Sequence, residues 1–343
     1  MKSKLNLLVL SLVLICTSLS FAGNAPSFQV AAHFAIAGDG GWDYITFDPD
    51  GGRVFIARAT HVQVVDAATG KLVGDIADTP GVHGVAIAAD FGVGAISNGK
   101  ANTVSLFDVK SLKKTADVKS GTKPDAILYE PLTHHVIAFN GKSGDATVID
   151  PATGAVVATI ALNGAPEAGA SDLKGNVFVN LEDKNELVKL DVNKNMVLAH
   201  WPLTGCDGPT GLAMDRKSNR IFSVCANKVM TVLDGDSGKL VATLPIGSHP
   251  DAAAFDPELQ LAFSSNGDGT LTVVHEDSPD KYTVIHNVAT ASGARTMALD
   301  PKTHRIFLVT AKFGPPPAPT TAEPKPRPAM IPGSFEMLVV EPK

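Results

Sequence analysis

The sequence predicts an all-β protein, a seven-bladed β-propeller built from four-stranded antiparallel blades. Two residue markers recur seven times, each repeat contains four short strand patterns, and the last repeat lacks its fourth strand. The first marker is an acidic residue, often followed by proline, and recurs about every 42 residues. Its copies are Asp48, Asp90, Glu130, Asp172, Asp215, Asp256 and Asp300. The second marker has the same period up to the sixth repeat, at Asp66, Asp108, Asp150, Asp191, Asp234 and His275, and ends at Glu341. Such a period indicates stacked units, none of which buries its apolar face alone.

Each repeat reads as four strands joined by turns. The first strand ends at the first marker, as in 44–47, and a turn rich in Pro, Gly, Asp and Asn follows it. The second is a continuous apolar run such as 54–57, which is typical of a strand packed on both faces. The third ends at the second marker, as in 147–150, and the fourth follows a Thr-Gly or Ser-Gly turn, as in 240–244. Four strands in about 42 residues, repeated seven times, predict a propeller.

The two ends of the chain predict how the ring closes. The third strand of the seventh repeat, 335–340, is followed only by a few residues up to Lys343. Residues 28–36 have strand character and precede the first repeat. We expect this N-terminal strand to be the outer strand of the seventh blade, which hides two sheet edges that would otherwise invite aggregation.

The residue pattern of the repeats resembles that of a known family. The sequence Pro-Asp-Ala-Ala-Ala-Phe-Asp-Pro opens the unit 250–274, and the units 124–150 and 209–234 are similar to it. These units resemble YVTN-type β-propeller repeats, as in YncE-like bacterial proteins, over about residues 27–343. The resemblance implies a propeller fold and an extracytoplasmic location. It implies no catalytic signature.

Residues 1–22 have the pattern of a signal peptide. A positively charged start precedes an apolar run at 5–16, and small residues precede Gly23, as cleavage requires. Cys16 raises a lipoprotein alternative, which the bulky residue before it disfavours. We therefore expect a single domain at 23–343, secreted to the periplasm or the cell exterior.

Composition and charge limit the classes of partner. The chain is 44% hydrophobic and 19% charged, enough for a substantial core. Its formal net charge is −6, and an acidic surface repels phosphate backbones, which argues against nucleic acid as a partner. No segment after the signal peptide is long enough to span a bilayer. We expect a monomer whose partner is a protein or a small polar ligand.

Two cysteines remain after processing, Cys206 and Cys225. Pairing the hairpin around Asp215 and Arg220 places both at the same end of the fifth blade. In an oxidising compartment a disulfide is expected there, with a stabilisation of about 2–4 kcal/mol. Two free thiols are the alternative.

One set of loops predicts a binding site at the mouth of the central channel. These loops enter the first strand of each blade, so they alone converge on the axis. Their ionisable candidates are Asp43, His83, Asp125, Glu167, Asp251 and Arg295. Together they suit a cation or a polar ligand, and Arg295 is the sole cation that we expect in this ring. The competing interpretation is structural, because Asp also caps repeat turns and symmetry brings any such residue to the axis.

The loops between the second and third strands lie on the same face. Asparagine recurs in them and is explained by local turn geometry. Arg58, Glu182 and Lys312 break that pattern, so we expect them to contact a ligand. A divalent metal is compatible with the carboxylates and His83, although no metal-binding spacing is present, and no covalent cofactor motif is found.

A proline-rich segment, 314–333, is inserted in the seventh blade, between its second and third strands. Its proline density favours an extended conformation without sheet pairing. It is interpreted either as a lid or docking strap for a partner, or as a tolerated solvated loop.

Two classes of function follow. The first is a binding or interaction scaffold that presents its loop face and channel mouth to a ligand. The second is a propeller enzyme that uses the channel carboxylates for metal-assisted hydrolysis of a lactone or ester, an idea that rests on fold analogy alone. The lack of a specific catalytic motif favours the first.

Overall fold

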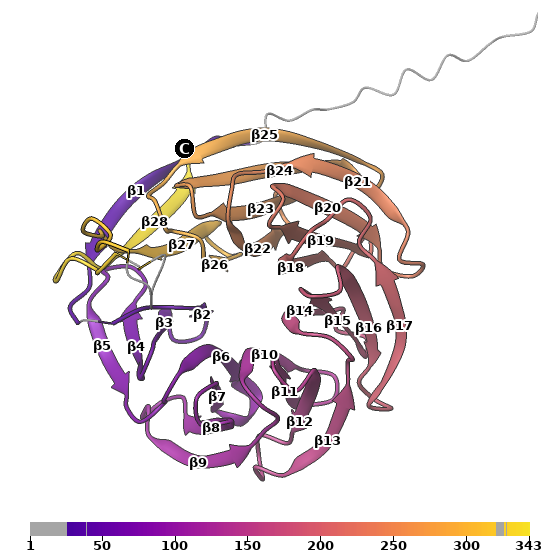
Figure 1. Ribbon diagram of the computed structural model, residues 1–343, viewed down its shortest axis with the longest axis horizontal. Helices are drawn as coiled ribbons and strands as arrows, with labels where there is room; N and C mark the ends of the chain where they lie inside the picture. Colours follow the sequence, from indigo (N-terminus) through magenta and orange to yellow (C-terminus); the bar gives the residue numbers. More distant parts are fainter. Residues whose placement is uncertain (1–25, 39, 320–325, 327) are drawn as a thin grey trace, which may run out of the picture.

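The computed structural model describes residues 26–38, 40–319, 326 and 328–343. Its strands form seven four-stranded antiparallel sheets, arranged as blades around a central axis (Figure 1). The predicted seven-bladed propeller is confirmed. Residues 1–22, the predicted signal peptide, lie outside the described part. Within that part, no helix is both long and apolar enough to cross a membrane.

The blades follow one another along the chain, and within each the strands run from the axis outward. Blade 1 contains β2 (Ile45–Asp48), β3 (Arg53–Arg58), β4 (His61–Asp66) and β5 (Leu72–Ile76). Blade 2 contains β6 (Val82–Ala88), β7 (Val93–Asn98), β8 (Thr103–Asp108) and β9 (Lys114–Lys119), with the short 3-10 helix η1 (Ala89–Phe91) after β6. Blade 3 contains β10 (Pro124–Glu130), β11 (His135–Asn140), β12 (Asp145–Ile149) and β13 (Val156–Ala161).

The remaining blades have the same order. Blade 4 contains β14 (Pro166–Ser171), β15 (Asn176–Leu181), β16 (Glu186–Asp191) and β17 (Met196–Pro202). Blade 5 contains β18 (Pro209–Asp215), β19 (Arg220–Cys225), β20 (Val229–Asp234) and β21 (Leu240–Pro245). Blade 6 contains β22 (Pro250–Asp256), β23 (Leu261–Asn266), β24 (Thr270–Ser278) and β25 (Lys281–Ala289). Blade 7 contains β26 (Met297–Asp300), β27 (Arg305–Thr310), β28 (Glu336–Pro342) and, as its outer strand, β1 (Phe28–Ala35).

Ring closure follows the prediction. β1 pairs with β28 in antiparallel register, from Phe28 opposite Pro342 to Ala35 opposite Glu336. Phe28 is 1% exposed, and its ring centroid lies 5.3 Å from that of Phe263 in blade 6. The first strand of the described chain therefore completes the last blade and also packs against blade 6.

The core lies between the blades, and the second strands carry much of it. In five blades the third residue of that strand is a fully buried phenylalanine. These residues are Phe55, Phe178, Phe222, Phe263 and Phe307. Each strand of this kind is buried on both faces, as its continuous apolar run predicts.

Blade 2 fills its core differently. Its second strand carries Gly94 and Ala95, and Phe107 of the third strand supplies the ring instead. Gly94 pairs directly with Phe107, and a Cβ added at Gly94 would overlap that ring. The glycine therefore makes room for a core side chain that arrives from the neighbouring strand.

The recurring acidic markers are explained by turn capping. Asp66 accepts hydrogen bonds from the backbone N–H of Thr69 at 2.8 Å and from its hydroxyl at 2.6 Å. Asp150 accepts a bond from the Thr153 hydroxyl in the same way, at 2.8 Å. A carboxylate that accepts backbone and hydroxyl donors fixes a tight turn. Asp108, Asp191 and Asp234 cap the equivalent turns, so this marker recurs as aspartate through the first five blades.

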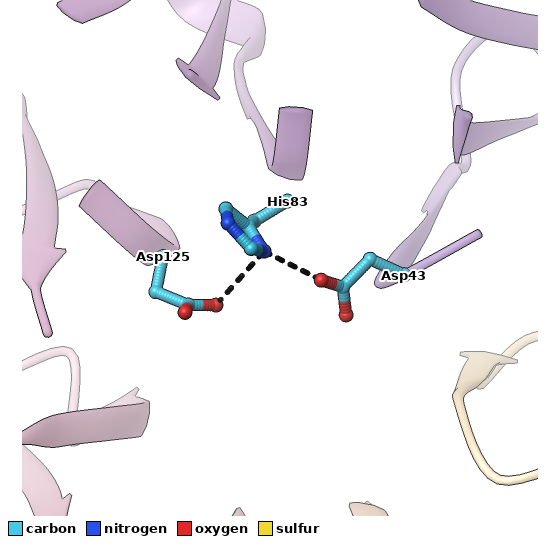
Figure 2. A group of neighbouring side chains, drawn as sticks. All are labelled: Asp43, His83 and Asp125. Carbon is cyan, nitrogen blue, oxygen red and sulfur yellow. Dashed lines mark hydrogen bonds and ion pairs between the residues drawn. The ribbon is translucent and has the colours of Figure 1, made fainter. Parts of the chain in front are cut away.

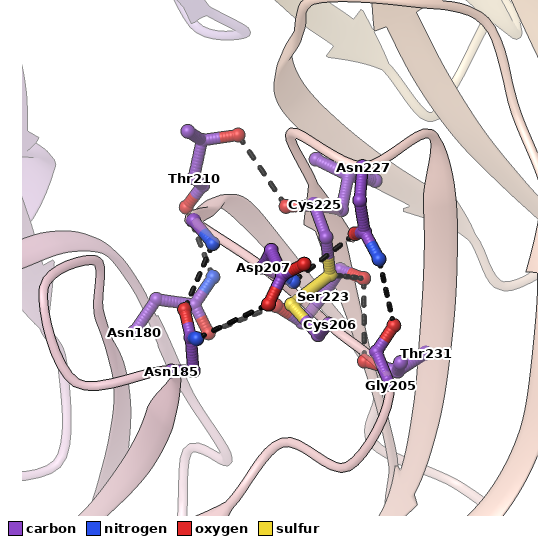
Figure 3. The surroundings of a disulfide bond; sticks show 12 residues. Asn180, Asn185, Gly205, Cys206, Asp207, Thr210, Ser223, Cys225, Asn227 and Thr231 are labelled. Atoms are coloured by element: carbon purple, nitrogen blue, oxygen red, sulfur yellow. Dashed lines mark hydrogen bonds between the residues drawn. A yellow bond between two sulfur atoms is a disulfide. The ribbon is translucent and has the colours of Figure 1, made fainter.

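A disulfide joins Cys206 and Cys225 at one end of blade 5, with their Cα atoms 5.4 Å apart (Figure 3). Cys225 ends β19 opposite Pro209, so the hairpin pairing places it beside the loop that contains Cys206. Asn227 supports the same loop, because its side chain accepts a bond from Asp207 N and donates one to Gly205 O.

The two ends of the proline-rich segment meet between β27 and β28. Phe313 and Met330 form an isolated antiparallel bridge, and Gly314 N donates a 2.9 Å hydrogen bond to Ala329 O. The ring of Phe313 lies 6.0 Å from that of Trp42. The described part of this segment is thus anchored beside the entry to blade 1.

Candidate functional site

The two predicted loop sets meet on one face of the ring. Backbone hydrogen bonds connect them, from Gly99 N to Gly81 O and from Gly141 N to Lys123 O, both at 2.8 Å. The residues at or just before the innermost strands project from this face toward the axis. We call the following set the channel mouth: Asp43, Tyr44, His83, Asp125, Glu167, Asp251 and Arg295.

Three of these side chains come together from blades 1, 2 and 3. His83 Nδ1 lies 2.6 Å from Asp43 Oδ2 and 3.5 Å from Asp125 Oδ1 (Figure 2). One ligand atom from each residue lies within 4.8 Å of the others. Within the described residues, no other group of three or more His, Cys, Asp or Glu side chains has this geometry. One imidazole and two carboxylates form a donor set that divalent metals use.

Tyr44 crosses the axis and was not predicted as a site residue. Its hydroxyl donates a 3.1 Å hydrogen bond to Glu167 Oε2 of blade 4, and its ring packs against the core of blades 3 and 4. The repeats do contain a sequence signal that distinguishes Tyr44. The position after each inner-ring residue is otherwise small, namely Gly84, Ala126, Ala168, Gly211, Ala252 and Thr296. The one large residue at this register is the one that reaches across.

Burial and mutual repulsion raise the pKa of three carboxyls at the mouth. Burial is the main cause of a pKa of about 8 for Glu167, and the charges of Asp125 and Glu182 add to it. Burial likewise raises the pKa of Asp251 to about 6, although the charge of Arg295 opposes the shift. Burial and the charge of Asp43 raise the pKa of Asp125, which is 6% exposed. Burial is the largest cause of the raised pKa in each of these three carboxyls.

Burial and the nearby carboxylates also shift the pKa values of Tyr44 and His83. Burial and then the charges of Glu167 and Asp125 hold the pKa of Tyr44 well above its usual value. Burial alone would lower the pKa of His83, but the hydrogen bond to Asp43 and the charge of Asp125 outweigh it and the pKa is raised. The shift of His83 therefore shows that the neighbouring carboxylates outweigh its burial, whereas burial is the main cause of the shift of Tyr44.

Two cations lie at the mouth, not one as predicted. Arg295 Nε pairs with Asp251 Oδ2 at 3.0 Å. Lys123 Nζ lies 3.2 Å from Asp125 Oδ2, and no pattern in the sequence distinguishes this lysine. The expectation that Arg295 is the sole cation of the inner ring is therefore wrong, because Lys123 is two residues before Asp125 and folds back over it.

Glu182 and Lys312, two candidates from the loops between the second and third strands, have different surroundings. Glu182 lies close enough for its charge to raise the pKa of Glu167 and of Asp251. Lys312 is exposed, and its backbone N–H donates to Ser334 Oγ at 3.0 Å at the base of the proline-rich segment.

Arg58 is fully buried rather than presented at the mouth. Its guanidinium donates to Gly38 O at 3.1 Å and to Gly40 O at 3.0 Å, and lies 3.6 Å from the centroid of the Phe335 ring. These contacts fix the chain that connects β1 to blade 1.

Comparisons with known proteins identify the fold alone. No protein-family model matches the chain, and no curated protein matches it. Many solved structures are similar. A chain of Kuenenia stuttgartiensis hydrazine synthase has a TM-score of 0.71 and 18% sequence identity, over 80% of this chain and 94% of that chain. The resemblance to YVTN-type repeats stays a prediction.

Proposed function

We propose that the protein is a binding propeller, secreted to the periplasm or cell exterior, whose channel mouth holds a divalent metal ion. The observation that carries the proposal is the placement of Asp43, His83 and Asp125, whose ligand atoms lie within 4.8 Å of one another. The metal would bind the imidazole and one oxygen of each carboxylate.

Electrostatics supports a cation at this place. Asp125 is buried, and the like charge of Asp43 adds to the rise in its pKa. A bound cation offsets this repulsion directly, because an opposite charge within a few ångströms favours the ionised carboxylate. The mixed nitrogen and oxygen donors favour first-row metals such as Zn²⁺ or Mn²⁺ over Ca²⁺, which prefers oxygen ligands alone.

The strands that position these three side chains also support a metal site. His83 and Asp125 lie within the innermost strands β6 and β10, and Asp43 is two residues before β2. Ligands built on strands keep their geometry better than ligands built on mobile loops. The predicted alternative, metal-assisted hydrolysis of a lactone or ester, is favoured by no observation on the described residues.

The test is calorimetric titration of Zn²⁺ and Mn²⁺ into the purified mature protein. We expect one site per chain, and at least about tenfold weaker affinity in His83→Ala and Asp125→Asn. Asp251→Asn is the matched control, because Asp251 occupies the equivalent position in blade 6 but pairs with Arg295. Equal loss in all three variants, or no binding by the wild type, would contradict the proposal.

A further inference from the structure

A groove of about 590 Å³ opens on the same face, over blades 1, 2 and 3. Asp43 and His83 form its inner edge, and Trp42 lines it toward blade 7. The volume lies within the range of small-molecule sites in proteins. The groove thus adjoins the channel mouth but extends away from the axis.

Most of the charged side chains that line the groove are lysines. Three lysines line it, Lys100, Lys123 and Lys142, against the single carboxylate of Asp43. Lys123 pairs with Asp125, whereas in the described part of the chain Lys100 and Lys142 have no side-chain hydrogen bond or ion pair. Both are exposed beside the groove, where ammonium groups attract an anion.

Lys123 occupies a backbone conformation that costs stability. Its φ is 56°, in the left-handed region, and the equivalent position in three other blades is a glycine, Gly81, Gly208 or Gly293, each with positive φ. A non-glycine residue there is disfavoured by about 1–2 kcal/mol. The Asn102 side chain holds it by accepting a 2.8 Å hydrogen bond from Lys123 N.

Trp42 gives the groove an apolar wall. Its indole lies 5.4 Å from the ring of Phe335 and 6.0 Å from that of Phe313, so packing fixes it on these sides. It still lines the groove. A fixed indole face suits a flat or ring-shaped ligand, whether a sugar ring or an aromatic one.

From these features we infer that the groove binds a small ring-shaped molecule carrying a carboxylate or phosphate group. The ring lies against Trp42, and the anionic group is held by Lys100, Lys123 and Lys142. The inference goes beyond the proposed metal site and does not require the metal, although the two sites share Asp43 and His83 as their boundary.

The experiment measures ligand binding by the fluorescence of Trp42. The chain has two tryptophans, so Trp201→Phe leaves Trp42 as the sole reporter. The probes are glucuronate, glucose 6-phosphate and benzoate, with glucose as the uncharged comparison, all added to EDTA-treated protein. We expect at least one anion to bind and glucose to bind more weakly than that anion. Binding by none of the anions, or glucose binding as tightly as they do, overturns the inference.

Lysine variants locate the anion. We expect Lys100→Ala and Lys142→Ala each to weaken binding roughly two- to fivefold, as an exposed ion pair does. Lys312→Ala is the matched control, because Lys312 is likewise two residues beyond the second strand, in blade 7, and does not line the groove. An equal loss in the control overturns the lysine assignment.

A second pair of variants separates binding from folding. Lys123→Gly should weaken anion binding without lowering the melting temperature, because glycine relieves the left-handed backbone. His249→Gly is its control, since His249 has the same φ of 56° at the equivalent position of blade 6. Unchanged anion binding in Lys123→Gly contradicts the role of this lysine.

Metal titration of the same samples distinguishes the two proposals. Loss of anion binding with intact Zn²⁺ binding in Lys100→Ala supports the groove site. Anion binding without any Zn²⁺ binding supports the groove site and contradicts the proposed metal site. Anion binding that appears only after Zn²⁺ is added assigns the anion to the metal and overturns the lysine site.

Discussion

At the scale of single residues, the channel mouth concentrates carboxyls whose pKa values are raised. Glu167, with a pKa of about 8, is protonated over much of the neutral range, and Tyr44 donates a hydrogen bond to it from across the axis. A metal ion at the mouth would lower these pKa values and release protons. Metal affinity should therefore increase with pH between about 6 and 8.

The same shifts predict a pH dependence of folding. The pKa of Glu167 is about 8 in the folded protein against a reference of 4.5, so the native state keeps a proton that the unfolded chain releases. This contribution is complete below pH 4.5 and is lost as the pH rises through 8. The free energy of unfolding should fall over this window by at most about 1.4 kcal/mol per pH unit for each such proton. Asp251 acts in the same direction near pH 6.

Urea denaturation at pH 5, 6.5 and 8 measures this effect. Glu167→Gln removes the titrating group but retains an acceptor for the Tyr44 hydroxyl, so its stability should depend less on pH than that of the wild type. An identical pH dependence in the two proteins would show that Glu167 does not cause the change of stability with pH.

The repeat register predicts where a residue lies within its blade. Asp43, His83 and Asp125 were selected because each enters an innermost strand, and this places them on one face. The register does not say which side chains touch across the axis, so Tyr44 and Lys123 were missed. Arg58 was selected because it breaks a pattern of asparagines, but its burial depends on Phe335, which is far away in sequence.

At the scale of elements, the blades are predictable because each repeat carries its own turn signals. The acidic markers cap the same turns in successive blades, and the apolar runs become the buried second strands. Blade 2 is less obvious from the sequence, since its core ring comes from Phe107 in the third strand. Only the pairing of Phe107 with Gly94 shows how the space is filled.

A substitution at Gly94 tests this packing. Gly94→Val should destabilise the protein by about 1–3 kcal/mol, because the new side chain overlaps the ring of Phe107. Gly92→Val is not a suitable control, since Gly92 has a φ of 64°. Gly41→Val is suitable for packing, since nothing lies within 4 Å of a Cβ at Gly41. Equal midpoints for Gly94→Val and the wild type in a denaturant titration would contradict the account of blade 2.

At the scale of the whole molecule, the pairing of β1 with β28 closes the ring. Both the missing strand of the last repeat and the extra strand at the N-terminus were visible in the sequence. The contact of Phe28 with blade 6 was not, because it depends on how neighbouring blades pack. Closure therefore links the first described strand to two blades.

Phe28→Ala tests the contribution of that contact. We expect a loss of about 3–5 kcal/mol in the free energy of unfolding, as for other buried aromatic residues. Phe91→Ala is the control, because Phe91 is 40% exposed and should cost less. Chemical denaturation of both variants compares them, and a loss at Phe28 no larger than that at Phe91 would count against β1 as an integral strand.

The most direct test of the central claim, a divalent metal held at the channel mouth, is a crystal structure grown with Zn²⁺. An anomalous difference map recorded at the zinc edge should show a peak about 2.0–2.2 Å from one imidazole nitrogen of His83 and from one carboxylate oxygen each of Asp43 and Asp125. A map with no peak among these three side chains, from protein that has been saturated with Zn²⁺, would contradict it.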